Sequence, residues 1–471
     1  MANAKLSVEE EIARESWNEI LPILPAERIW GFFDYTLITI GLAIASWVLL
    51  IGGTCAQFAN VKTGAAAILA GNSVAVLLVA LSVTILSNKY GVEQFTLLRS
   101  VFGHRGTILP LALSEVVWIG WTAFLMIMQG NVVLNILKVA VKVPQASEIW
   151  ITSSAGLMGI AFSWLVLRTG AKSIRKLSRF VAPGLGVMII LIAISILRGS
   201  SIGDLLALQR LETTRDKWEG FIIVFELNLG SGFAWWCFIG NLARLAKTRR
   251  SAFWPNMIGL NLFAVIASIV GLIAGLRFGT SDPTKWMIPL GGVAMGVLML
   301  LLIAFGNITA TVSTVYVACV ALRQRKSFQK ISWVRLLSIF LLPCAVLTLP
   351  SQLLYAHFGT LLAISGTLMS PLAGLCIVDF FVLRRQRIDL REIFNTSPSN
   401  KYSFWGGVNL LAVASVALGV VAHFLLFDPF TLANGRAFQL LSASLPAMLV
   451  TMCSYYGFAR IFMVPGTKGG Y

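Results

Sequence analysis

Charged residues are scarce in this sequence: Asp, Glu, Lys and Arg make up 12% of its 471 residues, whereas hydrophobic residues make up 57%. A soluble protein has about twice that share of charge on average. The shortage argues against a water-soluble fold, and the apolar residues are gathered in long runs. Because about 20 apolar residues in a helix cross a bilayer core about 30 Å thick, these runs predict an integral membrane protein.

Cysteine and histidine are also few. The six cysteines occur singly within apolar runs, with no Cys-x-x-Cys pair, which predicts free buried side chains rather than a disulfide framework. His104, His357 and His423 are far apart in the sequence and have no metal-ligand spacing. We also find no Ser/His/Asp set and no phosphate-binding loop. The sequence therefore predicts no enzyme, no metal site and no cofactor.

Acidic residues are outnumbered by basic ones, 20 to 37, which gives a net charge of +17. Most Lys and Arg fall on the side of the predicted spans that holds both termini, in clusters at 168–179, 244–250 and 323–330. This asymmetry predicts cytoplasmic termini in a cell (inner or plasma) membrane. The excess positive charge is then expected to contact anionic lipid, so we predict no nucleic-acid partner. Residues 1–31, which show no cleavable signal peptide, are expected to form a cytoplasmic arm.

Twelve apolar runs are long enough to be membrane-spanning helices. They cover residues 32–58, 64–87, 108–137, 149–167, 180–197, 218–245, 254–278, 289–322, 332–349, 352–383, 404–427 and 438–464. No linker or soluble domain separates them, so an all-α membrane domain is predicted.

Glycine clusters interrupt two of these runs. The first run contains Gly41 and a later glycine pair at 52–53. The sixth contains a Gly-Ser-Gly triplet, preceded by an acid and an amide and followed by two tryptophans: Glu226, Asn228, Gly230, Ser231, Gly232, Trp235 and Trp236. Glycine can simply let helices pack closely. Breaks at matching places in spans 1 and 6 instead favour an inverted-repeat transporter with unwound backbone around a midplane site.

Three stretches carry a resemblance to a known family. The strongest includes 371–374, 379–390 and 406–409, and the others are 90–106 and 241–247. They resemble segments of the nucleobase–cation symporter family, which contains purine–cytosine permeases and hydantoin transporters. The strongest stretch is similar to the end of helix 10 through the start of helix 11. Residues 90–106 resemble the loop before helix 3, and residues 241–247 resemble the end of helix 6. With the opening span, the likeness covers most of the chain.

The resemblance implies an all-α membrane fold of the LeuT type. Ten helices would form two inverted five-helix repeats, with helices 1 and 6 interrupted, and two further helices would lie at the periphery. The corresponding division is an arm at 1–31, repeats at 32–200 and 201–383, a cytoplasmic loop at 384–403, and peripheral helices with the C-terminus at 404–471. The implied activity is secondary active uptake of a flat heterocycle, driven by Na⁺ or H⁺.

In that family the substrate ring lies between a tryptophan of helix 3 and one of helix 6. On helix 3, one spacing favours Trp121 and the local Trp-x-Gly pattern favours Trp118. On helix 6, counting back from Asn241 reaches Gly232, whereas the purine–cytosine spacing reaches Trp235, which we prefer. A base stacked on an aromatic ring gains about 1–3 kcal/mol, and hydrogen bonds around its edge supply selectivity.

The resemblance also implies polar contacts from helices 1, 3 and 8. Where hydantoin transporters have Gln on helix 1, this chain has Ala45 beside Ser46, which favours a different substrate. On helix 8, Asn307 and Thr311 are one turn apart and would offer an amide and a hydroxyl to the edge of a base. The remaining substrate-site candidates are Thr122, Asn228, Gly230, Ser231, Gly232 and Trp236.

Sodium coupling is disfavoured by the residues on helix 8. In sodium-coupled members, helix 1 carbonyls and helix 8 hydroxyls supply the hard oxygen ligands that the ion needs. The matching carbonyls would be those of Gly41 and Ile44. Our alignment puts Ala304 and Phe305 at the hydroxyl positions, where neither side chain can bind Na⁺. Thr309, Thr311 and Ser313 come a turn or more later and could serve only if this alignment is shifted.

Two acids inside the spans offer a proton route. Glu115 precedes Trp118 by one turn, and Glu226 precedes the glycine triplet by one turn. A carboxylate at the bilayer centre costs about 3 kcal/mol, so such groups commonly face cavities and relay protons. The alternative is that each only hydrogen-bonds a neighbour. We expect proton coupling, with Glu226 ahead of Glu115. Asp379 is expected to be structural, pairing with Arg384 or Arg385.

We therefore predict a transporter that imports a nucleobase or related planar heterocycle, cytosine or a purine first, by proton-coupled alternating access. The alternative is sodium-coupled symport of allantoin, uracil, thiamine or another ring compound. The expected partners are the small-molecule substrate, the co-transported ion and the lipid bilayer, and no oligomer is required. A membrane enzyme would need a catalytic set, and a receptor-like sensor would need a soluble signalling extension; the sequence contains neither.

Overall fold

The computed structural model describes residues 21–471, apart from 45, 169–171, 199, 214, 396, 398 and 467; the side chains of 172–182 are also not described. Three sequence predictions therefore fall partly or wholly outside the described residues. They are the substrate-site candidate Ala45, the first twenty residues of the predicted cytoplasmic arm, and much of the basic cluster at 168–179.

The regular elements of the described chain are all helices. Its first half forms α2 (Phe32–Ala43), α3 (Ser46–Cys55), α4 (Val61–Val79), α5 (Ile85–Tyr90), α6 (Gln94–Leu97), α7 (Arg99–Gly106), α8 (Ile108–Ala140), α9 (Gln145–Leu167), α10 (Lys172–Arg198) and α11 (Ile202–Ala207). Short π-helical segments at Ala80–Thr84, Met257–Phe263, Val378–Leu383 and Ala459–Met463 continue longer helices. Among the described residues, extended pairing is limited to isolated bridges such as that between Trp30 and Ala246.

The second half supplies the remaining helices. They are α12 (Lys217–Ala234), α13 (Trp236–Ala243), α14 (Arg249–Asn256), α15 (Ala264–Phe278), α16 (Pro283–Arg323), α17 (Lys326–Gln329), α18 (Trp333–Thr348), α19 (Ser351–Ala356), α20 (Phe358–Ile377), α21 (Leu390–Phe394), α22 (Leu410–Leu426), α23 (Arg436–Leu441) and α24 (Ser444–Phe458).

The helices agree with the predicted membrane class. Within the described residues, six continuous helices are long and apolar enough to cross a bilayer, or up to eight if two bent pairs are each counted as one span. Three shorter apolar helices lie at Pro183–Arg198, Trp333–Thr348 and Leu410–Leu426. Each of the twelve predicted runs contains helix, but the count of twelve spans remains a prediction.

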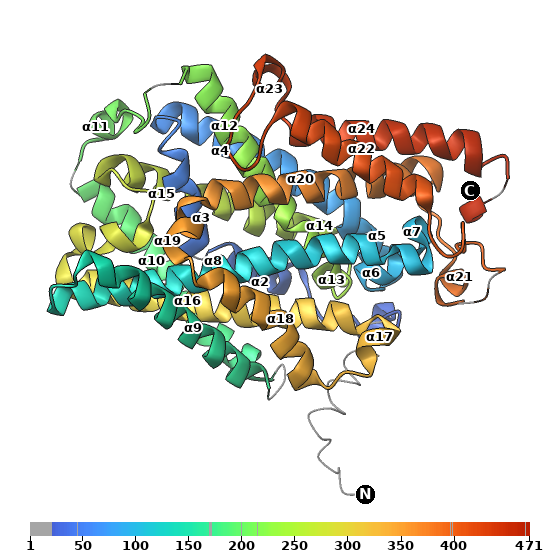
Figure 1. Cartoon of the computed structure of the whole chain (residues 1–471), viewed down its shortest axis with the longest axis horizontal. Coiled ribbons are helices and arrows are strands. Elements are labelled where there is room, and N and C mark those ends of the chain that lie inside the picture. Colours follow the sequence, from blue (N-terminus) through green and yellow to red (C-terminus); the bar gives the residue numbers. More distant parts are fainter. Residues whose placement is uncertain are drawn as a thin grey trace, which may run out of the picture.

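The long helices pack in two groups. One contains α3, α4, α12 and α15, and in the other α8 packs with α9, α16 and α18. The groups meet where α3 contacts α16, and α20 lies against α12, α22 and α24. In Figure 1 the helices run mostly along the horizontal axis, with α7, α21 and the C-terminus at the right-hand end and α11 at the left.

Both helices expected to be interrupted are bent pairs. α2 and α3 meet at 56°, at Ile44 and the undescribed residue 45, and α12 and α13 meet at 41° at Trp235. The expectation that the backbone unwinds at Gly230–Gly232 is wrong, because α12 remains helical through Ala234. A Cβ at Gly230 would overlap the carbonyl oxygen of Leu362, and one at Gly232 would overlap Ala75. These glycines therefore allow α12 to pack closely against α20 and α4.

The stretches that carry the family resemblance meet at the end of the molecule that contains α6, α7, α21 and the C-terminus, which we call the basic end. Arg249 donates to the side chain of Gln386, and Lys89 donates to its carbonyl oxygen. Residues 21–31 pack there too, since Ile23 donates to the carbonyl of Gly91. Both described ends of the chain therefore lie at the basic end, as the prediction of termini on one side requires.

An ion pair fixes this end of the fold. The Nε of Arg384 lies 2.8 Å from Oδ2 of Asp379, and both side chains are 1% exposed. Arg384 also donates to the carbonyls of Ser100 and Gly469, and its guanidinium lies 4.1 Å from the Tyr471 ring centroid. The structural pairing expected for Asp379 is thus present, and it ties the end of α20 to α7 and the C-terminus.

Removing one partner of a buried ion pair leaves the other charge without compensation, at a cost of about 3–5 kcal/mol. We therefore predict that Asp379→Asn clearly lowers the thermal unfolding temperature of the purified protein in detergent. Lys401→Gln is the control, because it removes the exposed pair with Asp389, and exposed pairs contribute about 0–1 kcal/mol. Equal unfolding temperatures for the two variants would show that the buried pair does not stabilise this end.

Candidate substrate site

Three tryptophans, two from helices and one from a helix junction, form an aromatic layer beside the bend of the first span. The ring of Trp47, one residue into α3, lies 5.5 Å from that of Trp121 on α8 and 5.6 Å from that of Trp235 between α12 and α13. Both contacts are edge-to-face, with interplanar angles of 78° and 63°. We call these residues the outer aromatic layer. Trp121 and Trp235 were predicted to line the site, whereas Trp47 was not.

A second aromatic layer lies toward the basic end. Phe95 of α6 contacts Trp118 at 6.0 Å and Trp236 at 6.1 Å, and all three side chains are buried. We call them the inner aromatic layer. Phe238 joins the layers, since its ring lies 5.8 Å from Trp118 and 5.9 Å from Trp235. The alternatives left open by the sequence therefore fall in different layers: Trp121 with Trp235, and Trp118 with Trp236.

Polar side chains of α16 approach the bend of the first span. The hydroxyl of Ser46 hydrogen-bonds to Oδ1 of Asn307, which is completely buried. Within the described residues, the Nδ2 of Asn307, the hydroxyl of Thr311 and the Nε1 of Trp121 are buried without hydrogen-bond partners. Buried polar groups in proteins almost always have partners. These donors and acceptors are therefore well suited to a polar ligand.

Other predicted site residues lie elsewhere. Asn228 of α12 donates to Val224 and to the thiol of Cys55. Gly230 and Gly232 pack against neighbouring helices, and Ser231 between them is 4% exposed. Thr122 of α8 is buried beside Cys344 of α18. The structure therefore does not bring these residues into the outer aromatic layer.

The helix 8 candidates divide between two faces of α16. Residues two apart on a helix point about 200° away from each other. Thr309 therefore lies opposite Asn307, and its hydroxyl donates to the carbonyl of Phe305, whose side chain is 54% exposed. Gly41 and Ile44 stand at the end of α2, where terminal carbonyls lack helical partners. Thr309 therefore does not lie on the face of α16 that approaches the end of α2.

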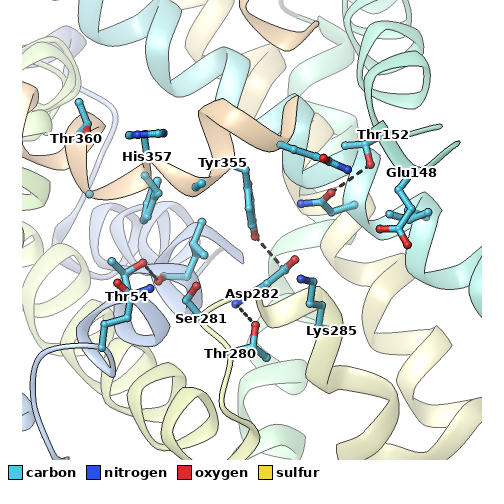
Figure 2. Close-up of a pocket in the computed structure, with 18 of the residues that line it drawn as sticks. Thr54, Glu148, Thr152, Thr280, Ser281, Asp282, Lys285, Tyr355, His357 and Thr360 are labelled. Carbon is cyan, nitrogen blue, oxygen red and sulfur yellow. Dashed lines mark hydrogen bonds between the residues drawn. The ribbon is translucent and has the colours of Figure 1, made fainter. Parts of the chain in front are cut away.

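A polar chamber of about 710 Å³ opens at the end opposite the basic end. Figure 2 shows α19 and the start of α16 across it, with Tyr355 donating to Asp282 at 2.9 Å. The lining includes Lys285, His357 and Glu148, and also Leu50 and Thr54 of α3. Its wall includes Phe358, whose ring lies 5.9 Å from that of Trp121. Phe358 therefore stands between the chamber and the outer aromatic layer.

Glu115 lies in the half of α8 that is nearer the basic end. Its Oε1 is buried and has no hydrogen-bond partner among the described residues. The thiols of Cys237, Cys319 and Cys344, from three different helices, lie near it. Because it sits one turn from Trp118, this carboxyl group adjoins the inner aromatic layer.

Glu226 faces away from both layers. The side chain is fully buried and accepts hydrogen bonds from the backbone N–H of Ala443 and Ser444 and from the Ser444 hydroxyl. Its Oε1 also lies 3.3 Å from Nε2 of His423 on α22. The carboxyl group thus joins α12 to α22 and to the start of α24, rather than to the substrate-site candidates.

His423 also contacts α20. The hydroxyl of Thr367 donates to the carbonyl of Ala363, and the same oxygen lies 3.1 Å from Nδ1 of His423. Because His423 contacts both Thr367 and Glu226, its imidazole links α22 to α20 and α12.

A family model and several known proteins are similar to this chain. The model described as permease for cytosine/purines, uracil, thiamine and allantoin matches residues 22–450. A purine-uracil permease of Arabidopsis thaliana is 24% identical over 426 residues, covering 86% of this chain and 70% of the relative. A hydantoin permease of Microbacterium maritypicum is 24% identical over 432 residues, covering 86% and 84%.

Among solved structures, the inward-facing conformation of Mhp1 has a TM-score of 0.76 at 19% identity, covering 94% of this chain and 93% of Mhp1. Mhp1 in a closed conformation with bromovinylhydantoin bound, described as a nucleobase-cation-symport-1 family transporter, has a TM-score of 0.71 at 19% identity, covering 94% and 96%. At this identity the likeness concerns the fold, and it confirms the predicted LeuT-type arrangement.

The Glu226–His423 contact generates a stability prediction. Glu226→Gln places an amide donor beside groups that are themselves donors, and His423→Phe removes the imidazole. Each substitution should lower the free energy of unfolding by about 1–3 kcal/mol. Because both substitutions disrupt one contact, the double variant should lose clearly less than the sum of the single losses. Thermal unfolding of the three variants in detergent measures this coupling. Additive losses would mean that the two side chains act independently.

Proposed function

The chain belongs to the family of permeases for cytosine, purines, uracil, thiamine and allantoin, and from that premise we propose that it imports a nucleobase or a related planar heterocycle by proton-coupled alternating access. As a permease it is a membrane transporter and not an enzyme. The proposal assigns the substrate to the outer aromatic layer and the two predicted repeats, 32–200 and 201–383, to the moving parts. Cytosine or a purine leads among the candidate substrates.

The single observation that carries this proposal is the outer aromatic layer beside buried, unpartnered polar atoms. Trp121 and Trp235 come from different helices and offer ring surfaces on which a flat heterocycle can stack. Asn307 and Thr311 add an amide donor and a hydroxyl, both buried without partners in the described part of the chain. A planar base needs such a combination, because its faces are aromatic and its edge carries donors and acceptors.

The chamber supports an access route on one side of this layer. Its polar lining suits a hydrated solute, and Phe358 separates it from Trp121. We propose that it opens to the outside of the cell membrane, with the basic end and both termini in the cytoplasm. The clustering of Lys89, Arg249 and Arg325 at the basic end supports that orientation. The proposal needs no oligomer.

For coupling, we propose that Glu115 carries the proton. A buried carboxyl oxygen without a partner can take up a proton without first breaking another interaction. Glu226, which the sequence favoured, already shares hydrogen bonds with His423 and Ser444. Proton movement through 100 mV supplies about 2.3 kcal/mol per charge.

A specific observation supports the sodium alternative. The Ser46 hydroxyl and Oδ1 of Asn307 meet at the bend of the first span, with the Thr311 hydroxyl one turn further along α16. Oxygens of this kind are what a hard cation requires. Sodium-coupled symport of allantoin, uracil, thiamine or another ring compound would use this group with the carbonyls of Gly41 and Ile44.

Stacking in the outer aromatic layer predicts a loss of uptake in two variants. Trp121→Ala and Trp235→Ala each remove a ring surface worth about 1–3 kcal/mol, which weakens binding by about 5- to 150-fold. Uptake of radiolabelled cytosine, uracil, adenine and allantoin by cells with matched membrane levels measures the effect. Trp150→Ala is the control, because that ring is 73% exposed. Normal uptake by both layer variants would rule out the stacking site.

Proton coupling predicts which gradient drives accumulation. In vesicles with purified protein, an inward proton gradient alone should concentrate the substrate, whereas an inward sodium gradient alone should not. Glu115→Gln should abolish gradient-driven accumulation and leave exchange of labelled for unlabelled substrate intact, because the amide cannot carry a proton. Accumulation with sodium alone, unchanged in Glu115→Gln, would favour the sodium alternative.

A further inference from the structure

Trp47 is the one member of the outer aromatic layer that the stacking mechanism does not use. It follows Ser46 at the start of α3, next to the bend of the first span, and is 9% exposed. Ser46 contacts Asn307, so the backbone that carries Trp47 is held against α16. The start of α3 therefore carries both a polar contact to α16 and the indole of the outer aromatic layer.

The ring of Trp47 bridges the two proposed stacking residues. It contacts both Trp121 and Trp235 with centroid separations near 5.5 Å. Edge-to-face contacts at such distances are favourable aromatic geometry. A substrate ring that stacks on Trp121 and Trp235 must therefore share this space with an indole or displace it.

Trp47 also lies on the same face of α3 as two residues of the chamber. Leu50 and Thr54, which line the chamber, are three and seven residues further along α3. Residues with this spacing share one face of a helix. Trp47 is thus one turn beyond the chamber lining on this face, and its neighbour Trp121 contacts Phe358 of the chamber wall.

An indole is a six-membered ring fused to a five-membered ring, which is also the outline of a purine. Resting on the proposed function, we propose that Trp47 is a specificity-determining residue that selects by ring size. Its indole takes up the room that a second fused ring would need. The outer aromatic layer accepts a single-ring heterocycle of the pyrimidine or hydantoin class beside Trp47, whereas a purine binds only by displacing it.

The first test measures ligand preference in the unaltered protein. Thermal shift titrations of the purified protein with cytosine, uracil and hydantoin are compared with adenine and hypoxanthine. At least one single-ring compound should bind at least tenfold more tightly than either purine. Equal or tighter binding of the purines would overturn the proposal without any variant that must fold.

The second test changes the ring. Trp47→Ala should shift the ratio of purine affinity to single-ring affinity by at least tenfold toward purines. The ratio for Trp47→Phe should lie between those of Trp47→Ala and the unaltered protein. Competition for radiolabelled uptake gives the ratio, and Trp254→Ala, with a side chain 53% exposed on α14, is the control. An unchanged ratio in Trp47→Ala and Trp47→Phe would overturn the proposal.

Different outcomes overturn size selection by Trp47 and the proposed substrate site. If Trp47→Ala leaves the ratio unchanged while Trp121→Ala abolishes uptake, size selection by Trp47 is wrong and the stacking site stands. If Trp121→Ala and Trp235→Ala both transport normally, the proposed substrate site is wrong and the Trp47 proposal falls with it.

Discussion

The constraint behind this structure is that a backbone inside a bilayer has no water to bond with. Helical segments satisfy their own peptide groups, and any break must be buried in protein or line a cavity. The bend between α2 and α3 meets that condition: Ile44 is 8% exposed, and Ser46 is hydrogen-bonded to Asn307. The aromatic layers lie around the two bends because tryptophans from several helices can meet there without exposing polar backbone to lipid.

The same constraint separates the acids by role. Glu226 and Asp379 are buried and each has strong partners, His423 with Ser444 for the first and Arg384 for the second. A buried charge is tolerated when it is paired and hydrogen-bonded, so these acids hold helices together. Glu115 differs because one of its oxygens has no partner in the described part of the chain. That contrast, rather than depth in the membrane, is what makes it the proposed proton carrier.

Much of the fold could be predicted from the sequence, because the length of an apolar run and its tendency to form a helix are local properties. The family stretches also identified the Asp379 ion pair. The substrate-site role of Trp121 and Trp235 stays a prediction, and the structure shows that both rings contact Trp47. Partners distant in the sequence were not recoverable: His423 lies 197 residues from Glu226. Trp47 was missed because a tryptophan in an apolar run has the same pattern whether it anchors in lipid or faces a cavity. The glycine triplet misled because close packing and unwinding both favour glycine.

The central claim is that a flat heterocycle stacks in the outer aromatic layer. The most direct measurement is an experimental structure of the purified protein with a transported heterocycle bound. The account predicts density for a planar ring in van der Waals contact with Trp121 and Trp235, with its edge toward Asn307. A ring bound elsewhere, with Trp47 still in contact with both tryptophans, would contradict it.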